Sequence, residues 1–122
     1  MSKYGNKKVI VNGHKFDSKM EADYYRYLYI AKSKGEIKDF QVHTKITLQP
    51  AFRYNGKAVA AITYTPDFIV FHNNGEVDYI DVKGVKTNEF RIKEKMLKFQ
   101  LKDFPKYNIY CLKLVGETWV KI

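Results

Sequence analysis

Two stretches of helical periodicity interrupt a chain that otherwise alternates between apolar and polar residues. The first stretch opens at Asp17-Ser18 and extends to about Ser33, with Gly35 placed to cap its C-terminus. Its apolar residues recur at helical spacing and should face a core; they are Ala22, Tyr25, Leu28 and Tyr29. The second stretch predicts a helix from about Asn88 to Lys102. Its apolar positions are Phe90, Met96 or Leu97, Phe99 and Leu101.

Short runs with strand character, separated by turn residues, occupy most of the remaining chain. Two of these runs flank the turn Asn12-Gly13, and another pair flanks the turn Asn55-Gly56. The runs are Lys8 to Val11, Gly13 to Phe16, Ile37 to His43, Lys45 to Leu48, Ala51 to Tyr54, Ala58 to Tyr64, Tyr107 to Val115 and Trp119 to Ile122. A helix, a run of antiparallel strands, a second helix and further strands predict an α/β (α+β) fold or a mixed three-layer sheet.

The clearest hairpin joins the segment 65–70 to the segment 79–84 through Asn73-Asn74-Gly75, residues that tolerate the positive φ of tight turns. With a three-residue loop, His72 pairs with Glu76, and Asp67 then lies directly opposite Asp81. Side chains opposite each other on one face of an antiparallel pair lie about 4.5–5.5 Å apart at Cβ. Two residues further on, Lys83 projects from the same face as Asp81.

A two-residue loop, Asn74-Gly75, is the alternative, and it would pair Asp67 with Val82 and turn Asp67 to the other face. The three-residue loop is preferred because it keeps four apolar side chains on one face, namely Phe68, Val70, Ile80 and Val82. Two facing carboxylates repel each other unless a cation lies between them, and without a metal the pKa of one should rise. The hairpin therefore predicts a cation site with an ammonium group beside it.

The composition fits one domain of 122 residues with a formal net charge of +9. Such a charge favours a nucleic-acid partner, because Lys and Arg neutralise phosphates. The chain has no apolar run of about 18 residues and no signal-peptide pattern, so a cytoplasmic protein without a membrane partner is expected. Residues 1–8 are expected to form a loose basic arm, and the single Cys111 to be a buried core thiol. The histidines are scattered, and none is assigned a catalytic role; they are His14, His43 and His72.

Pro66-Asp67 followed by Asp81-Val82-Lys83 resembles the PD-(D/E)XK nuclease signature in its Asp form. From the segment 15–18 to the Lys-rich helix, nearly the whole chain also resembles a family of small phage-encoded proteins assigned to that superfamily, close to resolvases of branched DNA. The resemblance implies a restriction-endonuclease-like core, with a mixed central sheet flanked by helices. It also implies Mg²⁺ or Mn²⁺ bound by Asp67, Asp81 and the Val82 carbonyl, with Lys83 assisting the attacking water or the transition-state charge.

Many members of the superfamily carry a glutamate on the helix before the sheet, and Glu21 matches it in type and position. From the residues alone, however, Ser18 to Glu21 is better explained as a capping box. Asp67 after Pro66 could likewise cap a turn, whereas Asp81 lies mid-strand, where Asp has poor propensity.

The second predicted helix carries Arg91, Lys95, Lys98 and Lys102 at intervals of three or four residues. This positive stripe is either an ordinary solvated face or a phosphate-contacting one. By the family resemblance, Lys93 or Lys95 approaches the scissile phosphate, and Lys86 and Thr87 are also placed for phosphate contact.

The sequence thus predicts a metal-dependent endonuclease acting on DNA, with a Holliday-junction resolvase as the leading substrate class. A general or site-specific DNA endonuclease is the first alternative, and a non-catalytic basic nucleic-acid-binding protein is the second. Paired cuts would need a homodimer, which resolvases of this superfamily typically form.

Overall fold

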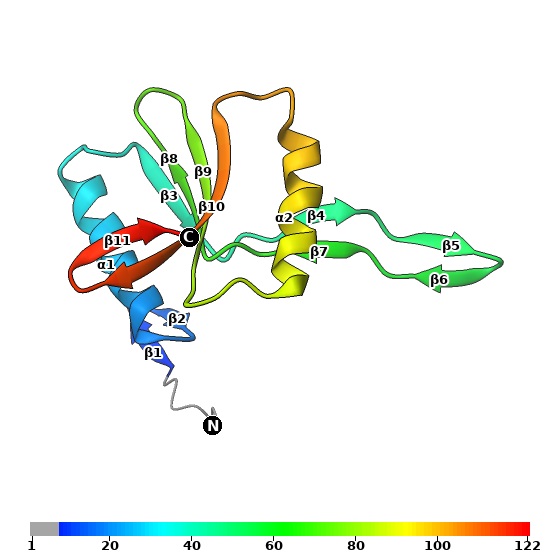
Figure 1. Cartoon of the computed structure of the whole chain (residues 1–122), viewed down its shortest axis with the longest axis horizontal. Helices are drawn as coiled ribbons and strands as arrows, with labels where there is room; N and C mark the ends of the chain where they lie inside the picture. The colour runs from blue at the N-terminus through cyan, green and yellow to red at the C-terminus, as the bar shows by residue number, and fades with distance from the viewer. Residues whose placement is uncertain (1–7) are drawn as a thin grey trace.

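A mixed sheet of five strands, in the order β11-β10-β9-β8-β3, forms the centre of the molecule (Figure 1). The computed structural model describes residues 8–122. The strands of this sheet are β3 (Asp39–Val42), β8 (Phe68–Phe71), β9 (Val77–Val82), β10 (Tyr107–Val115) and β11 (Thr118–Lys121). β9 and β10 are parallel, and the other neighbouring pairs are antiparallel. Parallel neighbours need a crossover connection, and helix α2 (Asn88–Leu101) supplies it.

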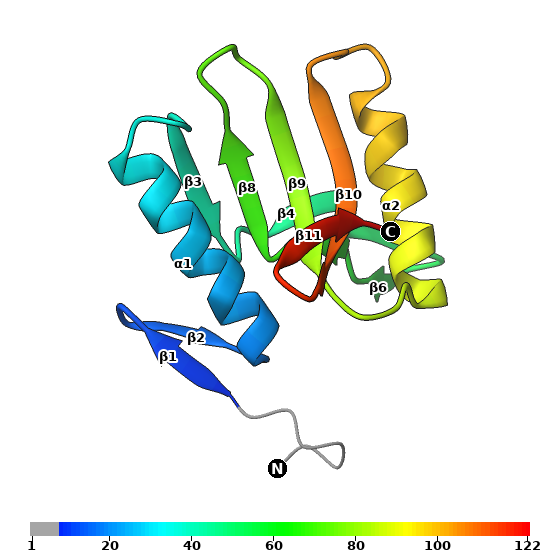
Figure 2. The same ribbon diagram turned by 60° about the vertical axis from the view of Figure 1, so that its left-hand side comes forward.

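The two helices cover opposite faces of this sheet (Figure 2). Side chains alternate along each strand, so the sheet presents a separate apolar face to each helix. Helix α1 (Lys19–Ser33) packs through Leu28 on one face, which presents Phe68, Val70, Ile80 and Val82. On the other face α2 packs through Phe90 and Leu97 against Ile109 and Cys111. The predicted α+β fold with a mixed sheet flanked by helices is confirmed, and so is the shared apolar face of the hairpin.

Among residues 8–122 the structure also has three two-stranded ribbons: β1 (Val9–Val11) with β2 (His14–Phe16), β4 (Ile46–Gln49) with β7 (Ile62–Tyr64), and β5 (Phe52–Tyr54) with β6 (Lys57–Val59). The strand expected from Ala58 to Tyr64 is therefore two strands. Its break faces Pro50, which has no backbone N–H and cannot continue a ladder. Both predicted Asn-Gly turns are confirmed, with positive φ at Asn12-Gly13 and at Asn55-Gly56.

Both helices lie where periodicity predicts them, and Gly35 follows the first with a φ of +75°. The prediction of burial is wrong for two of the expected core residues. Tyr29 is 52% exposed although it shares a helix face with buried Ala22, because it borders an open groove with His14. Phe99 is 71% exposed, because it is about 200° around the helix from buried Leu97.

Cys111 is fully buried and free, as predicted for a core thiol. The loose arm expected over residues 1–8 lies, apart from Lys8, outside the described residues. Neither described helix is long and apolar enough to cross a membrane.

Candidate active site

The β8–β9 hairpin has the three-residue loop, so the register that pairs the two aspartates is confirmed. The amide of His72 donates to the Glu76 carbonyl at 2.9 Å, and Gly75 has the left-handed φ of +91°. Phe68 pairs with Ile80, and one further step places Asp67, just before β8, opposite Asp81 in β9. The alternative two-residue loop is wrong.

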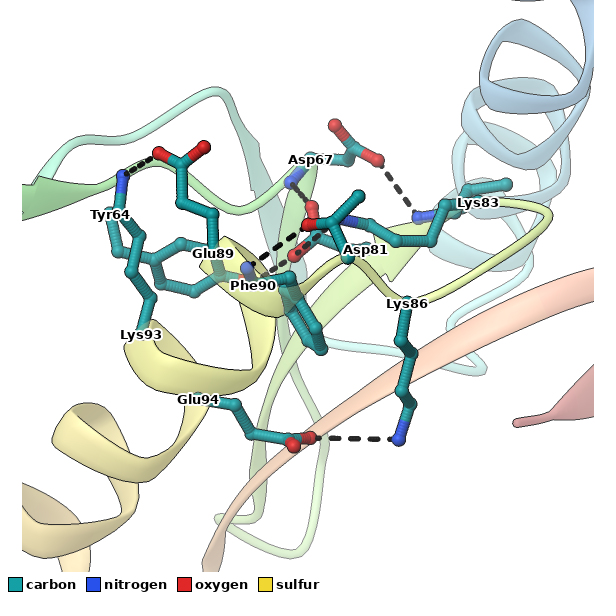
Figure 3. Close-up of polar contacts among 11 residues, drawn as sticks. Tyr64, Asp67, Asp81, Lys83, Lys86, Glu89, Phe90, Lys93 and Glu94 are labelled. Carbon is teal, nitrogen blue, oxygen red and sulfur yellow. Dashed lines mark hydrogen bonds and ion pairs between the residues drawn. The ribbon is translucent and has the colours of Figure 1, made fainter.

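Backbone and side-chain donors hold both aspartates (Figure 3). The Asp67 amide donates to Asp81 Oδ1 at 3.2 Å, and the Val82 amide donates to Asp67 Oδ2 at 2.8 Å. The Tyr64 hydroxyl, at the end of β7, donates to Asp81 Oδ2. Asp81 is only 4% exposed, so its carboxylate has a fixed orientation that Tyr64 and the Asp67 backbone determine.

Glu21 reaches the same end of the sheet from the first turn of α1. Its amide donates to Ser18 Oγ at 3.1 Å, which is the Ser half of the predicted capping box. Its carboxylate lies 2.6 Å from His43 Nε2 and is almost fully buried. Glu21 therefore belongs both to the helix cap and to the acidic cluster.

His43 is a residue that sequence reasoning missed. It follows β3 with a φ of +54°, and its amide donates to the Asp67 carbonyl at 3.2 Å. Its ligand atom and those of Glu21 and Asp67 lie within 4.8 Å of one another, as a group that could hold a metal ion. No motif marks His43, because it lies 22 residues from Glu21 and only the pairing of β3 with β8 brings it to this position. A left-handed conformation in a residue that is not glycine is common at functional sites.

This grouping differs in membership from the predicted ligand set. Glu21 and Asp67 belong to the group that could hold a cation, and His43 joins them where Asp81 was expected. Glu21 and Asp67 line an open cavity of about 600 Å³. Asp81 lines this cavity too, together with Val82, Lys83 and Gly84. Asp81 thus lies beside the candidate metal group, with both of its oxygens already accepting hydrogen bonds.

The pKa of Asp67 rises to about 8 because burial disfavours its charge, and because the charges of Asp81 and Glu21 repel it. The Val82 amide and the Lys83 ammonium act in the opposite direction. Burial also raises the pKa of Glu21, although His43 lowers it in part. The repulsion between Asp81 and Asp67 acts in the predicted direction for a metal-free acidic pair, and burial of Asp67 adds to it.

Lys83 supplies the ammonium beside the acids. Its Nζ lies 4.0 Å from Asp81 Oδ2 and 4.2 Å from the centre of the Phe90 ring. Phe90 belongs to the first turn of α2. The backbone amide of Lys83 donates to the Leu112 carbonyl in β10, which holds Lys83 at the C-terminal end of β9. Lys83 also lines a second hollow of about 300 Å³, which Asp81 and Thr87 share. The ammonium thus lies between the acids and an open space.

The predicted phosphate-contacting residues divide into two groups. Thr87 caps α2, with its Oγ1 accepting from the Phe90 amide, and Lys93 lines the hollow beside Lys83 while paired with Glu89 at 3.1 Å. Lys86 extends away from the two aspartates towards Glu94 (Figure 3). The remaining residues of the prediction occupy exposed positions on α2, and they are Arg91, Lys95 and Lys98.

A mixed sheet with a helix on each face, and with acids, an imidazole and an ammonium gathered at one sheet end, defines an α+β protein with a candidate cation site. The chain belongs to the DUF1064 family, described as a protein of unknown function, whose family model matches residues 1–116. No curated protein and no solved structure is significantly similar to it.

Proposed function

We propose that this protein is a metal-dependent endodeoxyribonuclease that hydrolyses phosphodiester bonds in branched DNA. One observation carries the proposal: Asp67 and Asp81 face each other across the hairpin, and Lys83 follows two residues later with its Nζ 4.0 Å from Asp81. Those three residues stand in the order and spacing of the PD-(D/E)XK signature. Glu21 adds an acid from the preceding helix, as in many members of that superfamily.

The donor set suits a divalent cation. Carboxylate oxygens are preferred by Mg²⁺ and Mn²⁺, and the His43 imidazole favours Mn²⁺ among these two. The raised pKa of Asp67 also supports a cation, because a positive ion would remove the repulsion from Asp81 and Glu21. Glu21, His43 and Asp67 would hold the ion, with Asp81 and the Val82 carbonyl as further candidates. When bound, such an ion lowers the pKa of a water and neutralises charge on the phosphate.

The protein groups around the acids have separate tasks in this proposal. Lys83 stabilises negative charge on the phosphate that enters the cavity, because its ammonium lies at the open side of Asp81. Tyr64 and the Asp67 amide orient the Asp81 carboxylate, as outer partners of metal ligands commonly do. The first turn of α2, capped by Thr87, lines the hollow, and the N-terminus of a helix favours an anion.

The net charge of +9 supports a nucleic-acid substrate, and the exposed cations of α2 lie on the element that borders the site. The choice of branched DNA rests on the resemblance to phage-encoded resolvases. Paired cuts across a junction would need two copies of the chain.

The test is cleavage of a labelled four-way junction and of a matched linear duplex, with Mg²⁺, Mn²⁺ or EDTA. Asp81→Asn should abolish metal-dependent cutting while DNA binding persists. Asp39→Asn is the matched control, because Asp39 is an exposed acid paired with Lys32 outside the site. Preference for the junction supports the resolvase, and equal cutting supports a general endonuclease. Tight binding without cutting in either metal would refute the enzyme and leave a DNA-binding protein.

A further inference from the structure

The ribbon that begins at β4 and returns at β7 extends far from the body of the molecule (Figure 1). Its base is anchored, because Leu48 and Tyr64 are buried with Phe90 and the Gln100 side chain donates to the Thr47 and Leu48 carbonyls. Its distal part, residues 50–61, is called the arm here and contains β5 and β6. Every residue of the arm is exposed except Val59, which is half-buried. The arm therefore contributes nothing to either core.

The arm presents an aromatic face and a cationic group on each side. Phe52 pairs with Val59 and Tyr54 pairs with Lys57, so these four side chains share one face of the ribbon. Phe52 is 44% exposed and Tyr54 is 66% exposed. Arg53 lies on the opposite face, where it donates to the Gly56 carbonyl at the turn. Exposed aromatic groups on a projecting two-stranded ribbon indicate a contact surface rather than a structural element.

The charge of this region indicates which kind of partner the arm contacts. Between Asp39 and Asp67 the sequence contains no acidic residue, and its cations are Lys45, Arg53 and Lys57. A second copy of the chain is disfavoured as the partner, because it carries a net charge of +9 as well. A polyanion that also offers flat apolar surfaces satisfies both the cations and the aromatic rings, and nucleic acid has that chemistry.

The arm is also continuous with the candidate active site. β7 leads from the arm directly to Tyr64, which donates to Asp81, and then to Asp67. From Tyr64 to the turn at Gly56 an extended chain spans roughly 25–30 Å. That length corresponds to about eight base pairs at roughly 3.4 Å each. DNA with a phosphate at the site can therefore contact the arm at the same time.

We infer that the arm is a DNA-contacting element that recognises the branch point of the substrate. Arg53 and Lys57 contact phosphates, and Phe52 and Tyr54 contact base faces that a branch leaves unstacked. An intact duplex hides those base faces, so the aromatic pair should matter for a junction and little for a duplex. This inference rests on the proposed function for its choice of DNA, but it concerns binding and not cleavage.

The test measures the affinity of labelled junction and linear duplex in EDTA, by fluorescence anisotropy over a salt titration. The charge variant is Arg53→Gln with Lys57→Gln, and the aromatic variant is Phe52→Ser with Tyr54→Ser. The matched controls are Lys38→Gln with Lys113→Gln, and Tyr29→Ser, all at exposed positions outside the arm. A third variant replaces residues 50–61 by Asn-Gly, which closes the ladder after its last pair, Gln49 with Ile62.

The charge variant should weaken binding of both DNAs about tenfold and reduce the salt slope by about two. The aromatic variant should weaken junction binding about tenfold and leave duplex binding nearly unchanged. Excision should combine both effects, with an unchanged thermal midpoint because the arm packs on neither core. Controls should bind as wild type does.

Unchanged affinity and salt slope in all three arm variants would overturn the inference. So would an aromatic variant that converts a dimer into a monomer without loss of DNA affinity, since the arm would then contact a second copy. The proposed nuclease is tested separately by adding Mg²⁺ or Mn²⁺. A wild type that binds through the arm but never cuts refutes the nuclease alone. Arm variants that bind DNA with wild-type affinity while the wild type cuts refute the arm alone.

Discussion

Asp67→Asn should stabilise the metal-free protein at neutral pH, although it alters a proposed metal ligand. In the folded protein the pKa of Asp67 is about 8, against an ordinary value of 3.8. At pH 7 the carboxyl group is therefore largely protonated when folded and ionised when unfolded, so folding takes up a proton. The corresponding loss of folding free energy at pH 7 is about 4 kcal/mol relative to low pH.

The sign follows from the raised pKa. The contribution of Asp67 to the free energy of unfolding is fully present below the pKa of this group in the unfolded chain, near 4. It is lost as the pH rises towards about 8, the pKa in the folded protein. Between pH 5 and pH 7 the wild type should lose about 3 kcal/mol. Asp67→Asn removes this contribution, and it leaves the contribution of Glu21, whose pKa is also raised by burial.

The assay is urea denaturation of the wild type and Asp67→Asn in EDTA, at closely spaced pH values from 5 to about 8.5. The control is Asp39→Asn, since Lys32 lowers the pKa of that exposed carboxyl and its removal should leave the wild-type slope in place. Excess Mn²⁺ or Mg²⁺ should stabilise the wild type, and more strongly at higher pH, because a cation competes with the proton. A wild-type stability that stays level or rises over this range in EDTA would refute the reasoning, as would an equal slope in Asp67→Asn.

Three further predictions concern the support of the site. Tyr64→Phe removes the hydroxyl that donates to buried Asp81 and should lower the free energy of unfolding by about 1–3 kcal/mol, measured in urea at pH 6; an unchanged midpoint would contradict that bond. Gly75→Ala places a side chain at φ +91° and should lower the thermal midpoint by the equivalent of about 1–2 kcal/mol. Cys111 is fully buried with its pKa raised to about 11, so a thiol reagent should label it only after unfolding; rapid labelling of the native protein would contradict its burial.

The hairpin could be predicted residue by residue because its register depends on local parity alone. Once Asn73 to Gly75 form the loop, the positions of Asp67 and Asp81 follow without knowledge of the rest of the fold. The helix that carries Glu21 could be predicted for a similar reason, since Ser18 and the apolar spacing are both local signals. Two strong local patterns therefore predicted most of the acidic cluster.

His43 and Tyr64 could not be predicted, because each reaches the acids through pairing between segments far apart in sequence. His43 depends on β3 lying beside β8, and Tyr64 depends on β7 ending beside β9. Their residue types alone carry no signal of this kind, since a lone histidine and one of ten tyrosines fit many positions. Phe99 failed for the opposite reason: an apolar residue type suggested burial that its helical angle does not allow.

The acidic cluster destabilises the fold, which indicates that its residues serve function and not stability. Glu21 and Asp81 are each 4% exposed, and Asp67 is close enough to both for their charges to raise its pKa. Burying carboxylates together is costly, and apolar residues of similar size often stabilise such a position. The Lys83 ammonium lies 4.0 Å from Asp81 and is partly exposed, so it offsets only part of that cost. A divalent cation would offset much more, and the predicted gain in stability of the wild type on adding Mn²⁺ measures that difference directly.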